Sequence, residues 1–317
     1  MNIQQMYSAI DVHVAGEAFR VIKDVPFMYY QSLDHLHEQI SCGWIDEIQL
    51  LLNEPRGFAG LKGCVVVPSI HKAVDAAVLF FDHEGSIPFH YGGIVAVVTT
   101  LLESGQLKKR ESNQYKIETL RGIFSVTANM EKSEVVSVSL ESKPCYVVEE
   151  NLQLSTAFGN IQYSLMQADQ LYAVFEKDEF FKEIRIENIS ELRRWGKAVL
   201  EVLPSNLSIK RVVLVDAAQI KENRIKTITF QDNEYIVRSP GFESTMVSYL
   251  SYRSKKDVCR ERPFINESIF NSFLTLKETN KIENGYTFTF TSRGFITGMQ
   301  TFVLDPTDPF PVGFLLK

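Results

Sequence analysis

Many short runs of β-branched and aromatic residues are distributed along the chain. Each run has the length of a buried strand, and they occur at residues 64–68, 76–80, 124–128, 135–140, 146–148, 212–215, 227–230 and 286–291. Asn284-Gly285, directly before the last run, is a dipeptide typical of a β-hairpin turn. The pattern predicts that strands form most of the fold.

Helical spacing of apolar residues is clear in two segments. Residues 93–104 show it, and Gly105 follows as a residue suited to ending a helix. Residues 244–253 show it again, and two further helices are expected at 27–42 and 189–203. Many strands with few helices, without a regular strand–helix alternation, predict an α+β fold rather than a doubly wound sheet.

The two clear helices begin in a similar way. The first helix start, residues 87–93, and the second helix start, residues 238–244, are both turns that contain proline and small residues and run directly into an apolar helix. The spacing alone allows two interpretations. Either the chain contains two similar halves that face each other, or these are two unrelated capped helices.

Composition narrows the class of protein. A length of 317 residues fits two domains, and a net charge of −6 argues against a general nucleic-acid binder. No apolar run reaches the roughly 18–20 residues of a membrane span. The chain also shows no signal peptide pattern. Cys42, Cys64, Cys145 and Cys259 form no CxxC pair, which argues against a disulfide framework or zinc site and favours the cytoplasm.

Several motifs then point to a known family. Residues 296–298 (ITG) and 303–314 (VLDPTDPFPVGF) resemble the closing signature of the proline racemase family. Residues 10–20 (IDVHVAGEAFR), 53–57 (NEPRG) and 238–240 (RSP) resemble other motifs of that family. The family includes proline racemases, 4-hydroxyproline 2-epimerases and trans-3-hydroxyproline dehydratases. The motifs occur in order from residue 10 to residue 314, so the resemblance covers nearly the whole chain.

The resemblance implies the proline racemase fold, which is similar to that of diaminopimelate epimerase. It has two pseudo-symmetric halves, each a curled sheet around a central helix, with the active site in a cleft between them. Here the halves are expected at residues 1–123 together with 294–317, and at 124–293. The family is an isomerase lineage that uses no cofactor and commonly forms homodimers.

The family places one catalytic cysteine at each helix start. One cysteine removes the Cα proton of a proline-like amino acid, and the other delivers a proton to the opposite face. In this chain His90 stands at the first cysteine position and Gly241 at the second. The histidine that contacts substrate in the family is Gly92, and the aspartate expected to hold the substrate amine is Val237.

These departures leave few candidates for chemistry. His90 is either a general base or a histidine with a structural role. Glu243 is either an acid/base group or a charge that caps the second helix. The other candidate contacts to a ligand are Tyr91, Gly92, Gly93, Val237, Phe242 and Ser244. Asp11, His13 and Glu17 are interpreted as structural, and no metal is expected.

The sequence therefore predicts a family member with a degenerate active site. We expect a cleft for a proline-like amino or imino acid, and no racemisation by a cysteine pair. One hypothesis is an altered enzyme, such as a one-base epimerase, dehydratase or eliminase that uses His90. The alternative is a non-catalytic module that binds a ligand or a partner. No cofactor, nucleic acid or membrane is expected, and a homodimer is possible.

Overall fold

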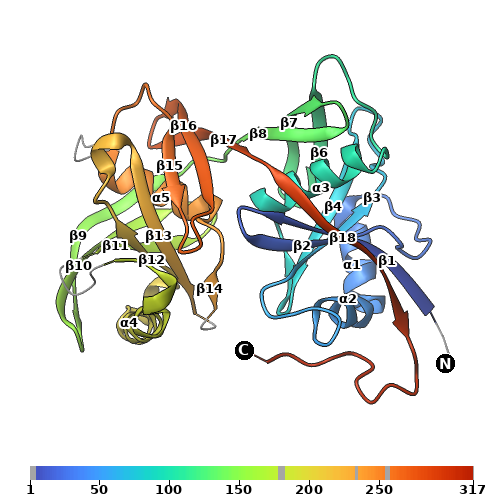
Figure 1. Cartoon of the computed structure of the whole chain (residues 1–317), viewed down its shortest axis with the longest axis horizontal. Coiled ribbons are helices and arrows are strands. Elements are labelled where there is room, and N and C mark those ends of the chain that lie inside the picture. Colours follow the sequence, from blue (N-terminus) through green and yellow to red (C-terminus); the bar gives the residue numbers. More distant parts are fainter. Residues whose placement is uncertain (1–4, 178–182, 233–234, 254–257, 317) are drawn as a thin grey trace. The chain divides into compact units, whose positions relative to one another are not determined.

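The chain forms two compact units in the computed structural model (Figure 1). The structure describes residues 5–177, 183–232, 235–253 and 258–316. The first unit comprises Met1–Leu140 and Ser292–Lys317, and the second comprises Glu141–Thr291. Residues 124–140, which the sequence analysis assigned to the second half, thus lie with the first unit, because their strands pair with one another and with the strand before them.

In the described residues, the first unit contains nine strands with parallel and antiparallel pairings, and three helices. Its strands are β1 (Gln5–Val14), β2 (Glu17–Ile22), β3 (Lys62–Val67), β4 (Ala76–Asp82), β5 (Gly85–Ile87), β6 (Gln114–Thr119), β7 (Gly122–Glu131), β8 (Glu134–Glu141) and β18 (Gly294–Leu304). Its helices are α1 (Leu33–Gly43), α2 (Ile45–Leu52) and α3 (Tyr91–Glu103).

The second unit contains strands and helices in a similar sequence. Its strands are β9 (Tyr146–Thr156), β10 (Gly159–Gln167), β11 (Leu171–Glu176), β12 (Arg211–Asp216), β13 (Arg224–Gln231), β14 (Ile236–Val237), β15 (Phe264–Glu267), β16 (Phe273–Ile282) and β17 (Gly285–Ser292). Its longer helices are α4 (Ile189–Val202) and α5 (Phe242–Arg253).

The two units repeat one order of strand pairing. In the first unit, β2 and β3 are parallel, β3 and β4 antiparallel, β4 and β6 parallel, and β6 and β7 antiparallel. In the second unit, β11 and β12 are parallel, β12 and β13 antiparallel, β13 and β15 parallel, and β15 and β16 antiparallel. In each unit the second parallel connection contains the helix start identified from the sequence. The predicted α+β fold is confirmed, and its two halves share one topology.

The helix in that connection is buried in each unit. All residues of α3 from Tyr91 to Leu102 are buried, and so is nearly all of α5. A helix that is apolar on every side, as α3 is, belongs in the centre of a core. Helix α5 instead carries polar residues with internal partners; for example, Thr229 Oγ1 donates a hydrogen bond to Ser244 Oγ at 2.8 Å.

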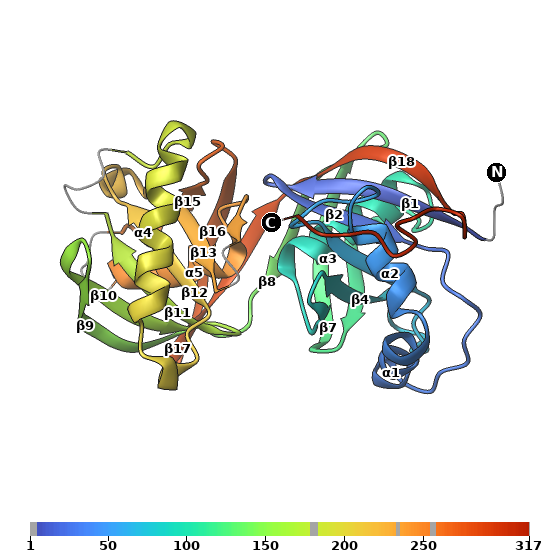
Figure 2. The same cartoon turned by 90° about the horizontal axis from the view of Figure 1, so that it is seen from below.

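The opposite face of each sheet is covered by amphipathic helices. Alternate residues of β3 and β4, such as Val65 and Leu79, belong to the core cluster with α1 and α2, whereas Phe80 faces the start of α3. In the second unit, Trp195 of α4 packs in a cluster with Phe175 and Phe230. Figure 2 shows α4 lying across the strands of this sheet. Both faces of each sheet are therefore buried, and the central helix is fixed between strands.

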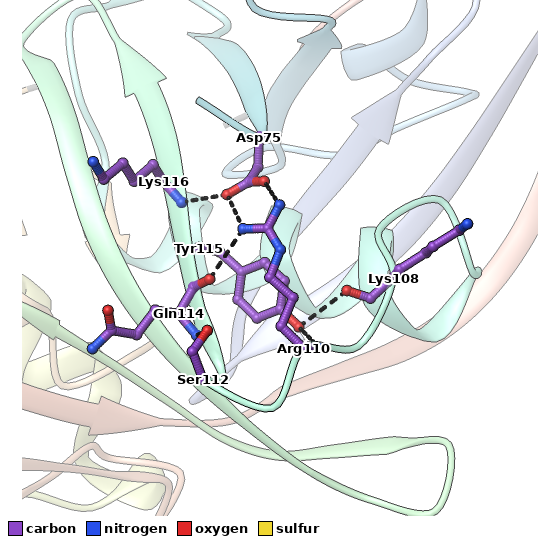
Figure 3. Close-up of polar contacts among 7 residues, drawn as sticks. All are labelled: Asp75, Lys108, Arg110, Ser112, Gln114, Tyr115 and Lys116. Carbon is purple, nitrogen blue, oxygen red and sulfur yellow. Dashed lines mark hydrogen bonds and ion pairs between the residues drawn. The ribbon is translucent and has the colours of Figure 1, made fainter. Parts of the chain in front are cut away.

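The loop after α3 is fixed by a polar cluster (Figure 3). The Asp75 carboxylate accepts hydrogen bonds from both terminal nitrogens of Arg110 and from the Lys116 backbone N–H, the last at 2.8 Å. The Arg110 guanidinium also lies 5.3 Å from the centre of the Tyr115 ring. These contacts join the segment that leaves α3 to the edge of β6.

Local signals account for most helix boundaries, with two corrections. The helix predicted at 27–42 begins only at Leu33, because Ser32 is the N-cap and its side chain accepts from His35 N. Helix α2 was not predicted. The hairpin at Asn284-Gly285 is confirmed, since Ile282 pairs with Gly285. Within the described ranges, every helix is too short or too polar to cross a membrane.

Candidate active site

His90 is the N-cap residue of α3. Its backbone is extended, with φ −152° and ψ 116°, as is usual for a cap. Its Nδ1 accepts a hydrogen bond from the Gly93 backbone N–H at 3.3 Å. His90 therefore satisfies one of the backbone donors that the first turn of a helix leaves without an intrahelical partner.

Glu17 lies beside the other nitrogen of this ring. It is the first residue of β2, and its Oε1 is 3.3 Å from His90 Nε2. The Glu17 side chain is only 7% exposed, whereas that of His90 is 21% exposed. The sequence analysis grouped Glu17 with a structural motif, so the structure adds a carboxylate to the first helix start.

The two contacts define the proton positions on His90. A neutral imidazole has one N–H donor and one acceptor nitrogen. The Gly93 N–H can only donate, so Nδ1 is the acceptor and Nε2 carries the hydrogen. The Nε2–H then points at the Glu17 carboxylate, which can only accept when ionised. Both ring nitrogens are thus engaged within the chain.

Aromatic rings surround His90. The Phe19 ring meets it edge-on at a centroid distance of 5.1 Å, and Phe80 lies at 6.5 Å. A side chain at Gly92 would place its Cβ 2.9 Å from Phe19 Cζ, and one at Gly93 would overlap the Phe80 ring. Phe19 therefore fills the room that a histidine at residue 92 would need, and the glycines allow this close packing.

The second helix start differs in its backbone. Gly241 has φ +72°, in the left-handed region that L-residues with side chains rarely adopt. A Cβ at this position would lie 2.9 Å from Ser244 Oγ. The position where the family resemblance places the second cysteine therefore lies in a turn that is unfavourable for a side chain.

A buried polar network supports this turn. Asn266, which is fully buried, donates to Thr245 Oγ1 at 3.0 Å and accepts from Thr227 Oγ1 at 3.0 Å. Thr245 Oγ1 donates in turn to the Gly241 carbonyl at 2.6 Å. Buried polar groups with mutual partners fix one geometry, and here they fix the turn before α5.

Glu243 is held by a tyrosine of its own unit. Tyr172 OH donates to Glu243 Oε2 at 2.7 Å. Burial and the neighbouring carboxylate raise the pKa of Tyr172 well above its ordinary value, so the hydroxyl keeps its proton. The proposal that Glu243 acts in acid/base chemistry stays a prediction, and it requires this hydrogen bond to give way.

The other side chains that the sequence analysis proposed as ligand contacts are buried and packed against neighbouring residues. Tyr91 meets Phe89 at 4.5 Å, and Phe242 meets Phe290 at 4.9 Å, both edge-on. Val237 is 5% exposed, and Ser244 is bonded to Thr229. Their predicted role in ligand binding stays a prediction, because these side chains support the helix starts in the structure.

The two buried cysteines, Cys64 and Cys145, are poorly suited to act as catalytic bases. All four cysteines are free thiols, and Cys42 and Cys259 are exposed. Burial raises the pKa of the Cys64 and Cys145 thiols, and the charges of Glu17 and Glu243 add to this, so the reactive thiolate form is disfavoured. Within the described ranges, no group of three or more His, Cys, Asp or Glu side chains is arranged to hold a metal ion.

The family motifs have clear structural roles. Asp11 pairs with Arg20 through two hydrogen bonds of 2.8 Å. In the C-terminal signature, Asp308 accepts from Arg56, and the backbones of Phe314 and Glu54 pair at 2.9 Å in both directions. The contacts of this signature fasten the C-terminal segment to the loop after α2.

The repeated order of strand pairing, with a helix start in each repeat, defines an α+β protein built of two similar units. Comparison with known proteins identifies its family. The family model described as proline racemase matches residues 9–315. A trans-3-hydroxy-L-proline dehydratase of Bacillus cereus is 27% identical over 336 aligned residues, which span 100% of both chains. The chain belongs to the proline racemase family.

Two crystal structures share the fold. A hydroxyproline epimerase from Agrobacterium vitis, with bound trans-4-hydroxy-L-proline, has a TM-score of 0.81 at 22% identity, covering 100% of this chain and 96% of the other. A probable proline racemase from Agrobacterium radiobacter, with bound carbonate, has a TM-score of 0.81 at 24% identity, covering 98% and 96%. The likeness establishes the fold across the whole chain.

Proposed function

We propose that the chain binds a proline-like cyclic amino acid at the first helix start and acts on it from one face only. The observation that carries this proposal is the asymmetry of the two helix starts. The first holds an imidazole next to a buried carboxylate, and the second holds Gly241, which has no side chain. Inversion at Cα needs an acid or base on each face, so the cysteine-pair racemisation of the family is absent.

Elimination is the reaction that suits a one-sided site. In trans-3-hydroxy-L-proline the hydroxyl and the carboxylate lie on opposite faces of the ring, so the hydroxyl lies on the same face as the Cα hydrogen. His90 takes the Cα proton, the C–H electron pair forms the Cα–Cβ double bond, and the C–O bond breaks. The imidazolium returns its proton to the departing hydroxyl, which leaves as water. The naming of a relative as a trans-3-hydroxy-L-proline dehydratase supports this choice.

The test is proton NMR in deuterated water with four ligands. Trans-3-hydroxy-L-proline should lose water, whereas the cis isomer, whose hydroxyl and Cα hydrogen lie on opposite faces, should not. L-Proline and trans-4-hydroxy-L-proline should exchange the Cα proton without changing configuration. His90→Ala should reduce these rates by about 10²–10⁴-fold, the usual contribution of a positioned base. Glu243→Gln is the matched control and should keep them. Inversion of trans-4-hydroxy-L-proline would contradict the proposal.

A second candidate function is binding without turnover. The observation that favours it is that both nitrogens of His90 are already engaged, by Gly93 and by Glu17. In that case the ligand series raises the melting temperature, but no Cα exchange or water loss is detected. Cytoplasmic location, a homodimer and the cleft between the halves also stay predictions.

A further inference from the structure

Glu17 lies on β2, outside the turn that begins α3, yet its carboxylate contacts the His90 ring. Glu17 begins β2, and β2 forms hydrogen bonds with β1 and β3 on either side, so the carboxylate is carried by a rigid element. Its side chain is almost fully buried, while His90 keeps an exposed edge. Burial of a carboxylate is costly unless it has a partner, and the ring of His90 provides one.

We infer that Glu17 is a positioning residue that fixes the tautomer of His90 and makes Nδ1 the base atom. Glu17 accepts from Nε2–H, so the proton-accepting lone pair lies on Nδ1, at the start of α3. When Nδ1 takes a proton, the ring becomes a cation beside the Glu17 carboxylate. Charged hydrogen bonds are roughly twice as strong as neutral ones, so this partner stabilises the protonated ring.

Nδ1 must lose its hydrogen bond from the Gly93 N–H, in the first turn of α3, before it can accept a proton. The Nδ1–Gly93 contact of 3.3 Å is longer than the usual 2.7–3.2 Å of an N–H donor bond, so it is weak. A carboxylate at the N-terminus of a helix is a stronger acceptor for that N–H. This step rests on the proposed function: the ligand's carboxylate takes the Gly93 N–H, and Nδ1 is then free to accept the Cα proton.

The surroundings favour such an arrangement. The Phe19 and Phe80 rings exclude water from one side of His90. Electrostatic attraction between a carboxylate and an imidazolium is stronger in a medium of low polarity than in water. The pair is also local, since all of these residues belong to the first unit.

The test reads the tautomer directly. Protein with ¹⁵N-labelled histidine is studied by long-range ¹H–¹⁵N correlation, and the His90 signals are identified by their loss in His90→Asn. The wild type should carry the hydrogen on Nε2. Glu17→Gln, which keeps an acceptor oxygen, should keep that tautomer. Glu17→Leu removes the acceptor and leaves only the weak 3.3 Å contact from the Gly93 N–H to hold the hydrogen on Nε2, so it should give a mixture of tautomers. Hydrogen on Nδ1 in the wild type, or an unchanged tautomer in Glu17→Leu, would overturn the inference.

A matched control exists in the same unit. Glu118 Oε1 lies 3.4 Å from His71 Nε2, a contact of the same kind outside the first helix start. Glu118→Gln should change the His71 signals and leave those of His90 unaffected. If Glu17→Leu does not fold, the wild-type spectrum and Glu17→Gln still decide the assignment.

Exchange kinetics supply the second readout. With trans-3-hydroxy-L-proline or L-proline in deuterated water, Glu17→Gln should slow Cα exchange at least tenfold, because the imidazolium loses its counter-charge. Adding ligand should also shift the Gly93 amide signal. Equal exchange in Glu17→Gln and wild type, or exchange that survives His90→Asn, would overturn the inference. If no ligand exchanges in any variant, the proposed function fails, and the tautomer spectra alone decide the role of Glu17.

Discussion

The left-handed turn at Gly241 allows a quantitative prediction about adding a side chain at this position. A residue with a Cβ at φ +72° costs about 1–2 kcal/mol in backbone strain alone. The Cβ would also lie 2.9 Å from Ser244 Oγ and 3.1 Å from Ser244 Cβ. Crowding of this kind in a packed site typically costs about 1–3 kcal/mol. Gly241→Ala should therefore lower the free energy of unfolding by about 2–5 kcal/mol, the sum of the two costs.

Gly105 separates the two contributions. It has φ +73°, almost the same as Gly241, but no atom lies within 4 Å of the position that its Cβ would take. Gly105→Ala thus measures the backbone cost without crowding and should lose only about 1–2 kcal/mol. Urea unfolding of the wild type and both variants gives the comparison. If Gly241→Ala is no more destabilising than Gly105→Ala, the crowding argument is wrong, and if it is neutral, the turn is not left-handed.

The same turn limits the recovery of racemase chemistry. A thiol at residue 241 would carry the same strain as alanine, so His90→Cys combined with Gly241→Cys should be less stable than the wild type. Polarimetry with L-proline should detect no racemisation in this double variant. Robust racemisation would show that the turn readily changes conformation and would refute the structural reasoning.

Three further predictions concern the rest of the molecule. Asp75→Ala should lower the free energy of unfolding by about 2 kcal/mol, because it removes a charged acceptor from Arg110 and Lys116, and urea unfolding tests this. Burial lowers the pKa of His83, so as the pH decreases the unfolded chain binds a proton at this residue before the folded chain does. The free energy of unfolding should therefore fall as the pH decreases from about 6.5, by at most about 1.4 kcal/mol per pH unit. His83→Gln should flatten this dependence, and urea unfolding at several pH values measures it. Thiol alkylation should leave any Cα exchange by the wild type unchanged, because the proposed base is His90 and residue 241 is glycine, so neither position carries a thiol. NMR before and after alkylation measures this.

The fold was predictable where local chemistry decides it. The apolar run at 93–104 and the turn before it identify α3. The strand runs lie within observed strands, except that the run at 64–68 extends one residue past β3. The start of α1 was placed too early, because residues 27–31 offer no capping side chain and the N-cap is Ser32. Helix α2 was missed because its eight residues are too short for a clear helical period.

The candidate site was predictable only in part. The motifs identify His90 and Gly241, since both are positions in a linear pattern. The contact between Glu17 and His90 joins residues that are far apart in the chain, and one sequence carries no record of which side chains meet. The sequence feature that could have drawn attention to Glu17 is the Gly16-Glu17 motif, which belongs to the family resemblance. The motif marks Glu17 as a candidate, but it does not show that the partner of Glu17 is His90.

On the proposed function, proton transfer at His90 competes with the capping of α3 at the first helix start. Nδ1 caps the helix through Gly93, and a cap of this kind contributes about 1 kcal/mol. The same lone pair must leave Gly93 before it can accept a proton, so any reaction at this atom first costs the helix its cap. A ligand with a carboxylate offsets that cost by replacing the ring as the acceptor, whereas a ligand without one leaves the N–H without a partner. On the proposed function, this arrangement favours amino acids over cyclic amines that lack a carboxylate, even before any contact with the rest of the ligand is considered.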